Sequence, residues 1–173
     1  MDVRMQARRS MEMDLRKALV NGEFELYYQS IHDLGRNRLC GFEALLRWNH
    51  PQRGMVSPAE IIPLAEETGF IVPVGEWVLR QACAEAANWP PHIKVAVNIS
   101  PKQFKSRNLV QAIVNAVVAS GLNPGRLELE ITETALRSAS KVAALSLSRA
   151  VSVISSSRRP GFNPEATTAL TMA

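Results

Sequence analysis

The chain has 173 residues, of which 46% are hydrophobic, a composition that is ordinary for a soluble globular protein. Residues 1–136 hold 15 basic and 15 acidic side chains, so the whole formal net charge of +4 comes from residues 137–173. Because the basic character belongs to a tail, it is poor support for a nucleic-acid-binding domain, and we expect no nucleic acid among the partners. No apolar stretch is long enough to cross a bilayer or to serve as a secretory signal, so we expect a cytoplasmic protein with no membrane segment in this chain.

The first part of the chain predicts a helix followed by a β-hairpin. Apolar residues recur along one face of residues 4–20, and Asn21-Gly22 provides a helix stop. Residues 24–29 are rich in aromatic side chains and alternate in part, as strands do. A turn at residues 35–37 leads into a second apolar strand at 39–48, so the two strands are expected to form a hairpin.

The remainder of the chain alternates helices with strands. Ser57 and Pro58 are typical of a helix start, and Gly69 is typical of a helix end. The elements expected after that helix are a helix at 73–89, a strand at 94–100, a helix at 108–120 and a strand at 126–133. The strand at 94–100 is almost continuously apolar, which is typical of a strand covered on both faces. This order predicts an α/β fold built on a parallel sheet or barrel.

One acidic residue needs a special explanation. Glu43 lies inside the apolar strand at 39–48, and a buried carboxylate is costly unless it is paired or bound to a metal. Arg47 follows four residues later, so an ion pair between Glu43 and Arg47 at the strand end is one interpretation. Metal binding is the other, and the two residues alone do not decide between them.

Two further oxygen-bearing residues lie late in predicted strands, namely Asn98 and Glu130. The carboxyl ends of strands in parallel sheets and barrels meet at one edge, so these residues are expected to converge with Glu43. Carboxylate and amide oxygens suit a hard cation such as Mg²⁺. The residues by themselves also allow simpler roles, with Asn98 satisfying backbone groups and the acids of 126–133 standing in solvent on an edge strand.

The three histidines, His32, His50 and His92, show neither pairing nor ligand spacing. We interpret all three as surface or loop residues, so the candidate cation site contains no histidine.

Five segments occur in a recognisable order and spacing: Tyr27-Tyr28-Gln29, Glu43 to Trp48, Ile61 to Glu66, Val97 to Ser100 and Leu129 to Glu133. Together they resemble the EAL domain, a bacterial phosphodiesterase family that acts on cyclic di-GMP. The helix within residues 1–21 is similar to the linker helix that joins a GGDEF domain to an EAL domain in tandem proteins.

The resemblance implies a modified TIM-type barrel that linearises cyclic di-GMP to pGpG with Mg²⁺ or Mn²⁺. The residue roles that it implies are metal binding by Glu43, Asn98 and Glu130, substrate binding by Gln29 and Arg47, and loop stabilisation by Glu133. A bound cation lowers the pKa of a water ligand and neutralises charge on the phosphoryl oxygens, which is why phosphodiester hydrolysis uses such ligands.

The chain also departs from the family pattern. Ser30 stands where the family usually has proline, and no Asp follows Asp33, so the family's Asp-Asp-Phe-Gly motif is missing. Residues 138–157 hold eight serines, and Glu165 is the only acid beyond Glu133. We interpret residues 1–21 as the linker helix, 22–136 as the N-terminal half of an EAL domain, and 137–173 as a non-family tail that is disordered or frameshifted.

A complete TIM-type barrel has eight strands and about 250 residues. We therefore expect an incomplete TIM-type barrel of about the first four strands, with no complete catalytic set and no turnover of cyclic di-GMP. Two other interpretations stay open: a non-catalytic binder of cyclic di-GMP, and an interaction fragment that associates with EAL-type chains, including its own copies, through an open sheet edge.

Overall fold

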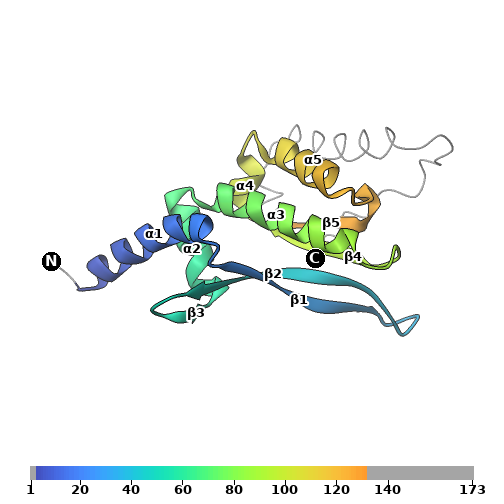
Figure 1. The fold of residues 1–173 in the computed structure, drawn as a ribbon, viewed down its shortest axis with the longest axis horizontal. Helices are drawn as coiled ribbons and strands as arrows, with labels where there is room; N and C mark the ends of the chain where they lie inside the picture. Colours follow the sequence, from blue (N-terminus) through green and yellow to red (C-terminus); the bar gives the residue numbers. More distant parts are fainter. Residues whose placement is uncertain (1–2, 132–173) are drawn as a thin grey trace.

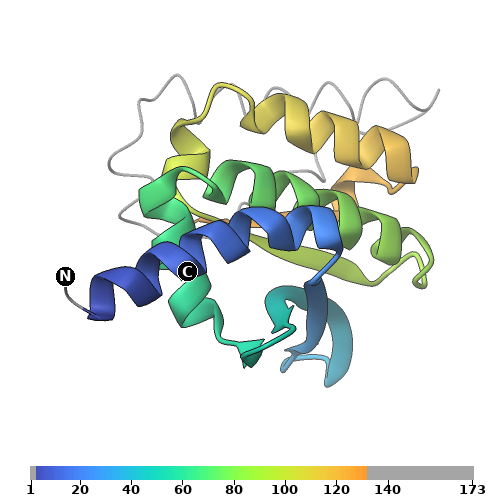
Figure 2. The same cartoon turned by 60° about the vertical axis from the view of Figure 1, so that its left-hand side comes forward.

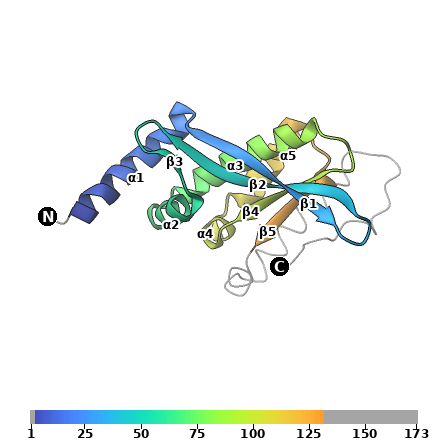
Figure 3. The ribbon, with the colours of Figure 1, turned by 90° about the horizontal axis from the view of Figure 1, so that it is seen from below.

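A five-stranded mixed sheet organises residues 3–131, the part of the chain that the computed structural model describes. Its strands are β1 (Phe24–Asp33), β2 (Arg38–His50), β3 (Gly54–Val56), β4 (Lys94–Ile99) and β5 (Leu127–Ile131). The strand order is β1-β2-β4-β5, with β3 paired to β2. β1 and β2 form the predicted antiparallel hairpin, whereas β2, β4 and β5 run parallel to one another and lie side by side in Figure 3.

The helices are α1 (Val3–Asn21), α2 (Pro58–Thr68), α3 (Ile71–Ala87), α4 (Pro101–Lys105) and α5 (Leu109–Ser120), with a short 3₁₀ helix, η1 (Pro124–Arg126), before β5. The long helix α3 packs on β1, β2 and β4. It also packs against α5, and the two helices run next to each other on the sheet in Figures 1 and 2. The predicted α/β fold is confirmed, and the helix and strand order agrees with the sequence pattern.

Local capping residues define the ends of α2 as the sequence predicts. The Ser57 side chain accepts a hydrogen bond from the Ala59 amide, and Pro58 occupies the first turn. Gly69 ends the helix with φ of 76°, a left-handed conformation that glycine adopts without steric cost. Three short elements, β3, α4 and η1, were not predicted. α4 has five residues and is held by a capping box between Ser100 and Gln103, a signal too short to give helical periodicity.

The prediction that residues 94–100 are covered on both faces holds for only part of this strand. Val95, Ala96 and Val97 are all buried, so both faces are covered there, but Asn98 is exposed. The alternation places Asn98 on the face of the sheet opposite α3. None of the helices in residues 3–131 combines the length and apolar character needed to cross a membrane.

The interpretation of His50 as a surface residue is also wrong. The His50 side chain is only 4% exposed, because β2 extends two residues past the predicted strand end and α1 lies against it. Its Nε2 lies 3.3 Å from Oδ2 of Asp14 in α1, and its Nδ1 accepts hydrogen bonds from the Gln52 and Arg53 amides. His50 therefore joins the carboxyl end of β2 to α1.

Helix α1 contributes Leu15 and Ala18, both fully buried, to the core. Met5, which falls on the same face by periodicity, is 53% exposed because the helix extends beyond the sheet at its amino end. The described residues thus form a core between one face of the sheet and the helices.

A close backbone approach at Gly41 generates a testable prediction. A Cβ atom at Gly41 would lie 2.9 Å from the Lys94 carbonyl oxygen in the parallel neighbour β4. Gly41→Ala is expected to destabilise the fold by about 1–3 kcal/mol, because strands β2 and β4 must separate to admit the methyl group. Urea unfolding of the 173-residue chain measures the effect. Gly35→Ala, in the hairpin turn where the nearest atom is 3.4 Å away, is the matched control and should unfold near the wild-type midpoint. Equal midpoints for both variants would contradict the prediction.

Candidate functional site

The alternation of side chains along each strand sorts the sheet into two faces. In β2, Ala44, Leu46 and Trp48 are buried against the helices, so Glu43 and Arg47 project from the opposite face. We call this opposite face, which α2–α5 do not cover, the site face. The side chains that β1, β2, β4 and β5 direct to it include Tyr27, Gln29, Glu43, Arg47, Lys94, Asn98, Glu128 and Glu130.

Three of the predicted residues meet on three neighbouring strands. Asn98 Nδ2 donates a hydrogen bond of 2.6 Å to Oε1 of Glu43. Asn98 on β4 is in register with Glu130 on β5. The register partner of Glu43 on β4 is Ala96, two residues before Asn98. Glu43 and Asn98 therefore contact each other, and the register places Glu130 beside Asn98.

The electrostatics of this cluster disfavour two ionised carboxylates side by side. Partial burial raises the pKa of Glu130 above its ordinary value, and the negative charges of Glu43 and Glu128 raise it further. A cation placed among these groups would reverse that repulsion.

Arg47 does not neutralise Glu43. Residues four apart on a strand are separated by about 13 Å, and the ion pairs among residues 3–131 include none between these two side chains. Arg47 instead donates a 2.8 Å hydrogen bond from Nη1 to the Leu46 carbonyl, and its guanidinium lies over the ring of Tyr27. The ion-pair interpretation of Glu43 is wrong, and its carboxylate accepts a hydrogen bond from Asn98 instead.

The simpler roles left open for two other residues also change. Asn98 bonds a side chain on another strand, so its role is not confined to satisfying backbone groups. Glu128 is not freely solvated, because it accepts a 2.7 Å hydrogen bond in an ion pair with Lys94. Glu128 lies two residues before Glu130 on the same strand. Glu133 and the basic tail lie outside the described residues.

Gln29 lies on β1 directly opposite Glu43 in the antiparallel register, and it is exposed on the site face. Sequence reasoning placed Gln29 near the site but missed two other residues of the same face, Tyr27 and Lys94. Period-two alternation was the available signal, because Tyr27 is two residues from Gln29 and Lys94 is four residues from Asn98.

The donor set fits a hard divalent cation. Two carboxylates and one amide supply oxygen ligands, the type that Mg²⁺ and Mn²⁺ prefer. With a cation bound, Asn98 has to present its amide oxygen in place of the nitrogen that it donates to Glu43 here. Within residues 3–131 no group of three or more His, Cys, Asp or Glu side chains is placed to hold a metal. Metal binding by Glu43, Asn98 and Glu130 therefore stays a prediction.

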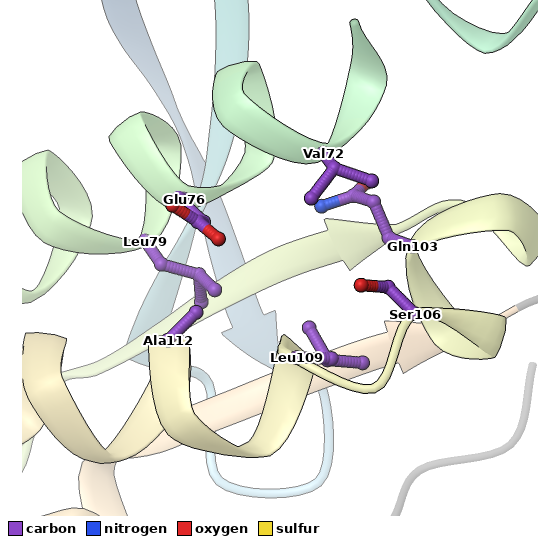
Figure 4. Close-up of a pocket in the computed structure, with 7 residues that line it drawn as sticks. All are labelled: Val72, Glu76, Leu79, Gln103, Ser106, Leu109 and Ala112. Atoms are coloured by element: carbon purple, nitrogen blue, oxygen red, sulfur yellow. The ribbon is translucent and has the colours of Figure 1, made fainter. Parts of the chain in front are cut away.

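A small gap lies within the helix layer, away from the site face. Figure 4 shows a gap between α3 and the α4–α5 segment, lined by side chains that include Glu76, Gln103 and Ser106. Its volume is about 10 Å³, enough for no more than a single water molecule. This gap is a packing feature of the helix layer and offers no room for a ligand.

The raised pKa of Glu130 gives a prediction with a defined sign. The folded chain binds the Glu130 proton more tightly than the unfolded chain does. The stability that this proton contributes is present below the carboxyl's ordinary pKa of 4.5 and is lost as the pH rises through the higher folded value. Glu130→Gln, which cannot ionise, is expected to have a higher urea midpoint than wild type at pH 7, and the difference should shrink towards pH 4.

Glu25→Gln removes an exposed carboxylate from the same face and is the matched control for this measurement. Its midpoint should stay near that of wild type at both pH values. A Glu130→Gln midpoint at or below wild type at pH 7 would contradict the inferred repulsion.

The chain is similar in sequence and fold to known proteins. The family model described as the EAL domain matches residues 12–153. The chain is 52% identical over 136 residues to the protein y4lL of Sinorhizobium fredii, a match that covers 79% of this chain and 16% of y4lL. It is 44% identical over 131 residues to MucR of Pseudomonas aeruginosa, a bifunctional diguanylate cyclase/cyclic di-GMP phosphodiesterase, covering 73% of this chain and 19% of MucR.

The structure of the PaMucR phosphodiesterase in complex with c-di-GMP matches with a TM-score of 0.75 and 38% identity, covering 80% of this chain and 57% of that one. The chain thus spans less than a quarter of the two relatives named above and more than half of the solved one. The open sheet is a partial form of the TIM-type barrel of these domains, as predicted. Since both the sequence match and the shared fold extend over most of its length, the chain belongs to the EAL domain family.

Proposed function

We propose that the site face binds cyclic di-GMP together with a divalent cation, as the N-terminal half of a cyclic di-GMP phosphodiesterase site. The observation that carries the proposal is the contact between Asn98 and Glu43, with Glu130 in register beside Asn98. Membership of the EAL family supports it, as do a relative named as a cyclic di-GMP phosphodiesterase and a matching structure in complex with c-di-GMP.

In this proposal different residues of the site face bind different parts of the ligand. Glu43, Asn98 and Glu130 hold Mg²⁺ or Mn²⁺, which when bound supplies an activated water and neutralises phosphoryl charge. Arg47 presents a planar set of N–H donors, which matches two oxygens of a phosphate. Gln29, opposite Glu43, offers an amide donor and acceptor at the neighbouring strand.

We propose further that the 173-residue chain binds without turning its ligand over. The resemblance to the family implies that hydrolysis uses carboxylates that follow the segment around Glu130. This sequence has no Asp after Asp33 and only Glu165 beyond Glu133, so it has few groups to complete the cation site or to act as a general base. Binding needs fewer groups than catalysis, and this proposal assigns the cation to Glu43, Asn98 and Glu130 and a phosphate to Arg47.

Isothermal titration of the purified chain with cyclic di-GMP in Mn²⁺ tests the proposal. Arg47→Ala is expected to weaken binding by roughly 10- to 100-fold, because a charge-assisted hydrogen bond to a phosphate contributes about 1.5–3 kcal/mol. Arg36→Ala, which changes an exposed arginine of the hairpin turn, is the matched control and should bind like wild type. Glu43→Ala should abolish the Mn²⁺ dependence of binding.

Chromatography of the same mixtures detects pGpG and tests the absence of turnover. Formation of pGpG by wild type that disappears in Glu43→Ala would contradict that part of the proposal. A wild-type chain that binds no cyclic di-GMP with Mn²⁺ present would contradict the binding function itself.

A further inference from the structure

Two contacts orient the Arg47 side chain. The guanidinium carbon lies 5.3 Å from the centroid of the Tyr27 ring, and Nη1 donates to the Leu46 carbonyl at 2.8 Å. A free arginine on a strand samples many rotamers, and ordering it when a ligand binds costs conformational entropy. The contacts with the ring and the carbonyl restrict these rotamers in the folded chain, so less entropy is lost when a ligand binds.

The register of the hairpin explains why Tyr27 reaches Arg47. Tyr27 is directly opposite Leu45, and Arg47 is opposite Glu25. Tyr27 and Arg47 are therefore diagonal neighbours on adjacent antiparallel strands, a separation that aromatic and long side chains span. Both project from the site face, on which Glu43 and Asn98 also lie.

The contact with Tyr27 leaves N–H donors of the guanidinium free to bind a phosphate. The guanidinium carbon lies over the Tyr27 ring, and one N–H of Nη1 is engaged by the Leu46 carbonyl. A phosphate is recognised by N–H groups of the guanidinium, and those that neither contact engages stay available to it. The two contacts together orient those donors.

Tyr27 has no evident structural role that would explain the contact otherwise. It is 49% exposed and stands outside the buried core. Its neighbour Tyr28, in contrast, projects to the helix side and packs edge-on against Trp89 with ring centroids 5.2 Å apart. The Tyr27 ring thus lies on the site face, where the Arg47 guanidinium contacts the face of the ring.

We propose that Tyr27 is a positioning residue for Arg47, holding its guanidinium ready for a phosphate of the bound nucleotide. This inference rests on the proposed function and adds to it a residue that sets nucleotide affinity without contacting the cation. The ring face does the positioning, so the phenol hydroxyl is dispensable.

Titration of the full chain with cyclic di-GMP in Mn²⁺ tests the inference. Tyr27→Ala is expected to weaken nucleotide binding about 3- to 10-fold, whereas Tyr27→Phe, the matched control that keeps the ring, should bind like wild type. In the Arg47→Ala background, Tyr27→Ala should cause no further loss, because its effect acts through Arg47.

Two further readouts separate positioning from general structural damage. Mn²⁺ affinity, measured by electron paramagnetic resonance, and the thermal midpoint should both stay at wild-type values in Tyr27→Ala. Tyr27→Ala binding as tightly as wild type, or a Tyr27→Ala loss that persists undiminished in the Arg47→Ala background, would overturn the inference alone. A wild-type chain that binds no cyclic di-GMP would overturn the proposed function, and the inference with it.

Discussion

The parallel pairing of β2, β4 and β5 is the constraint on which the site depends. Because side chains alternate along a strand, a slip of one residue would turn Glu43 into the apolar helix layer and bring an apolar neighbour to the site face. The register that prevents this slip is favoured by the buried residues of β4 and β5, and by Gly41, whose missing Cβ admits the Lys94 carbonyl. Correct packing on the helix side therefore decides which polar groups meet on the other side.

The polar cluster works against the stability that this packing provides. Glu43 on β2 and Glu130 on β5 lie on either side of β4, and partial burial, followed by the negative charge of Glu43, raises the pKa of Glu130. Lys94 compensates Glu128 one step below, but the carboxylates above it have only the Asn98 amide between them. Such uncompensated charge is a common feature of binding sites, where function is retained at some cost in folding free energy.

β2 carries both Glu43 and Arg47, and its carboxyl end is anchored by the segment that precedes the hairpin. Trp48 is fully buried and donates its indole N–H to Glu23 at 2.9 Å, a bond that helps to lower the pKa of that carboxyl. Two residues later, His50 contacts α1. These contacts hold the strand next to Arg47, while the Tyr27 ring holds its guanidinium. Rigid support from several elements is what a preorganised binding site requires.

Residue types and their spacing determined much of this protein without further information. The caps at Ser57 and Gly69 defined α2, and the five family segments predicted the residues of the site. Only the tertiary structure decided which of them touch. Glu43 pairs with Asn98, 55 residues away, and not with Arg47 four residues away, because an extended strand separates near neighbours while parallel pairing joins distant ones. The burial of His50 was equally invisible in the sequence, since it arises from the packing of α1 against the end of β2.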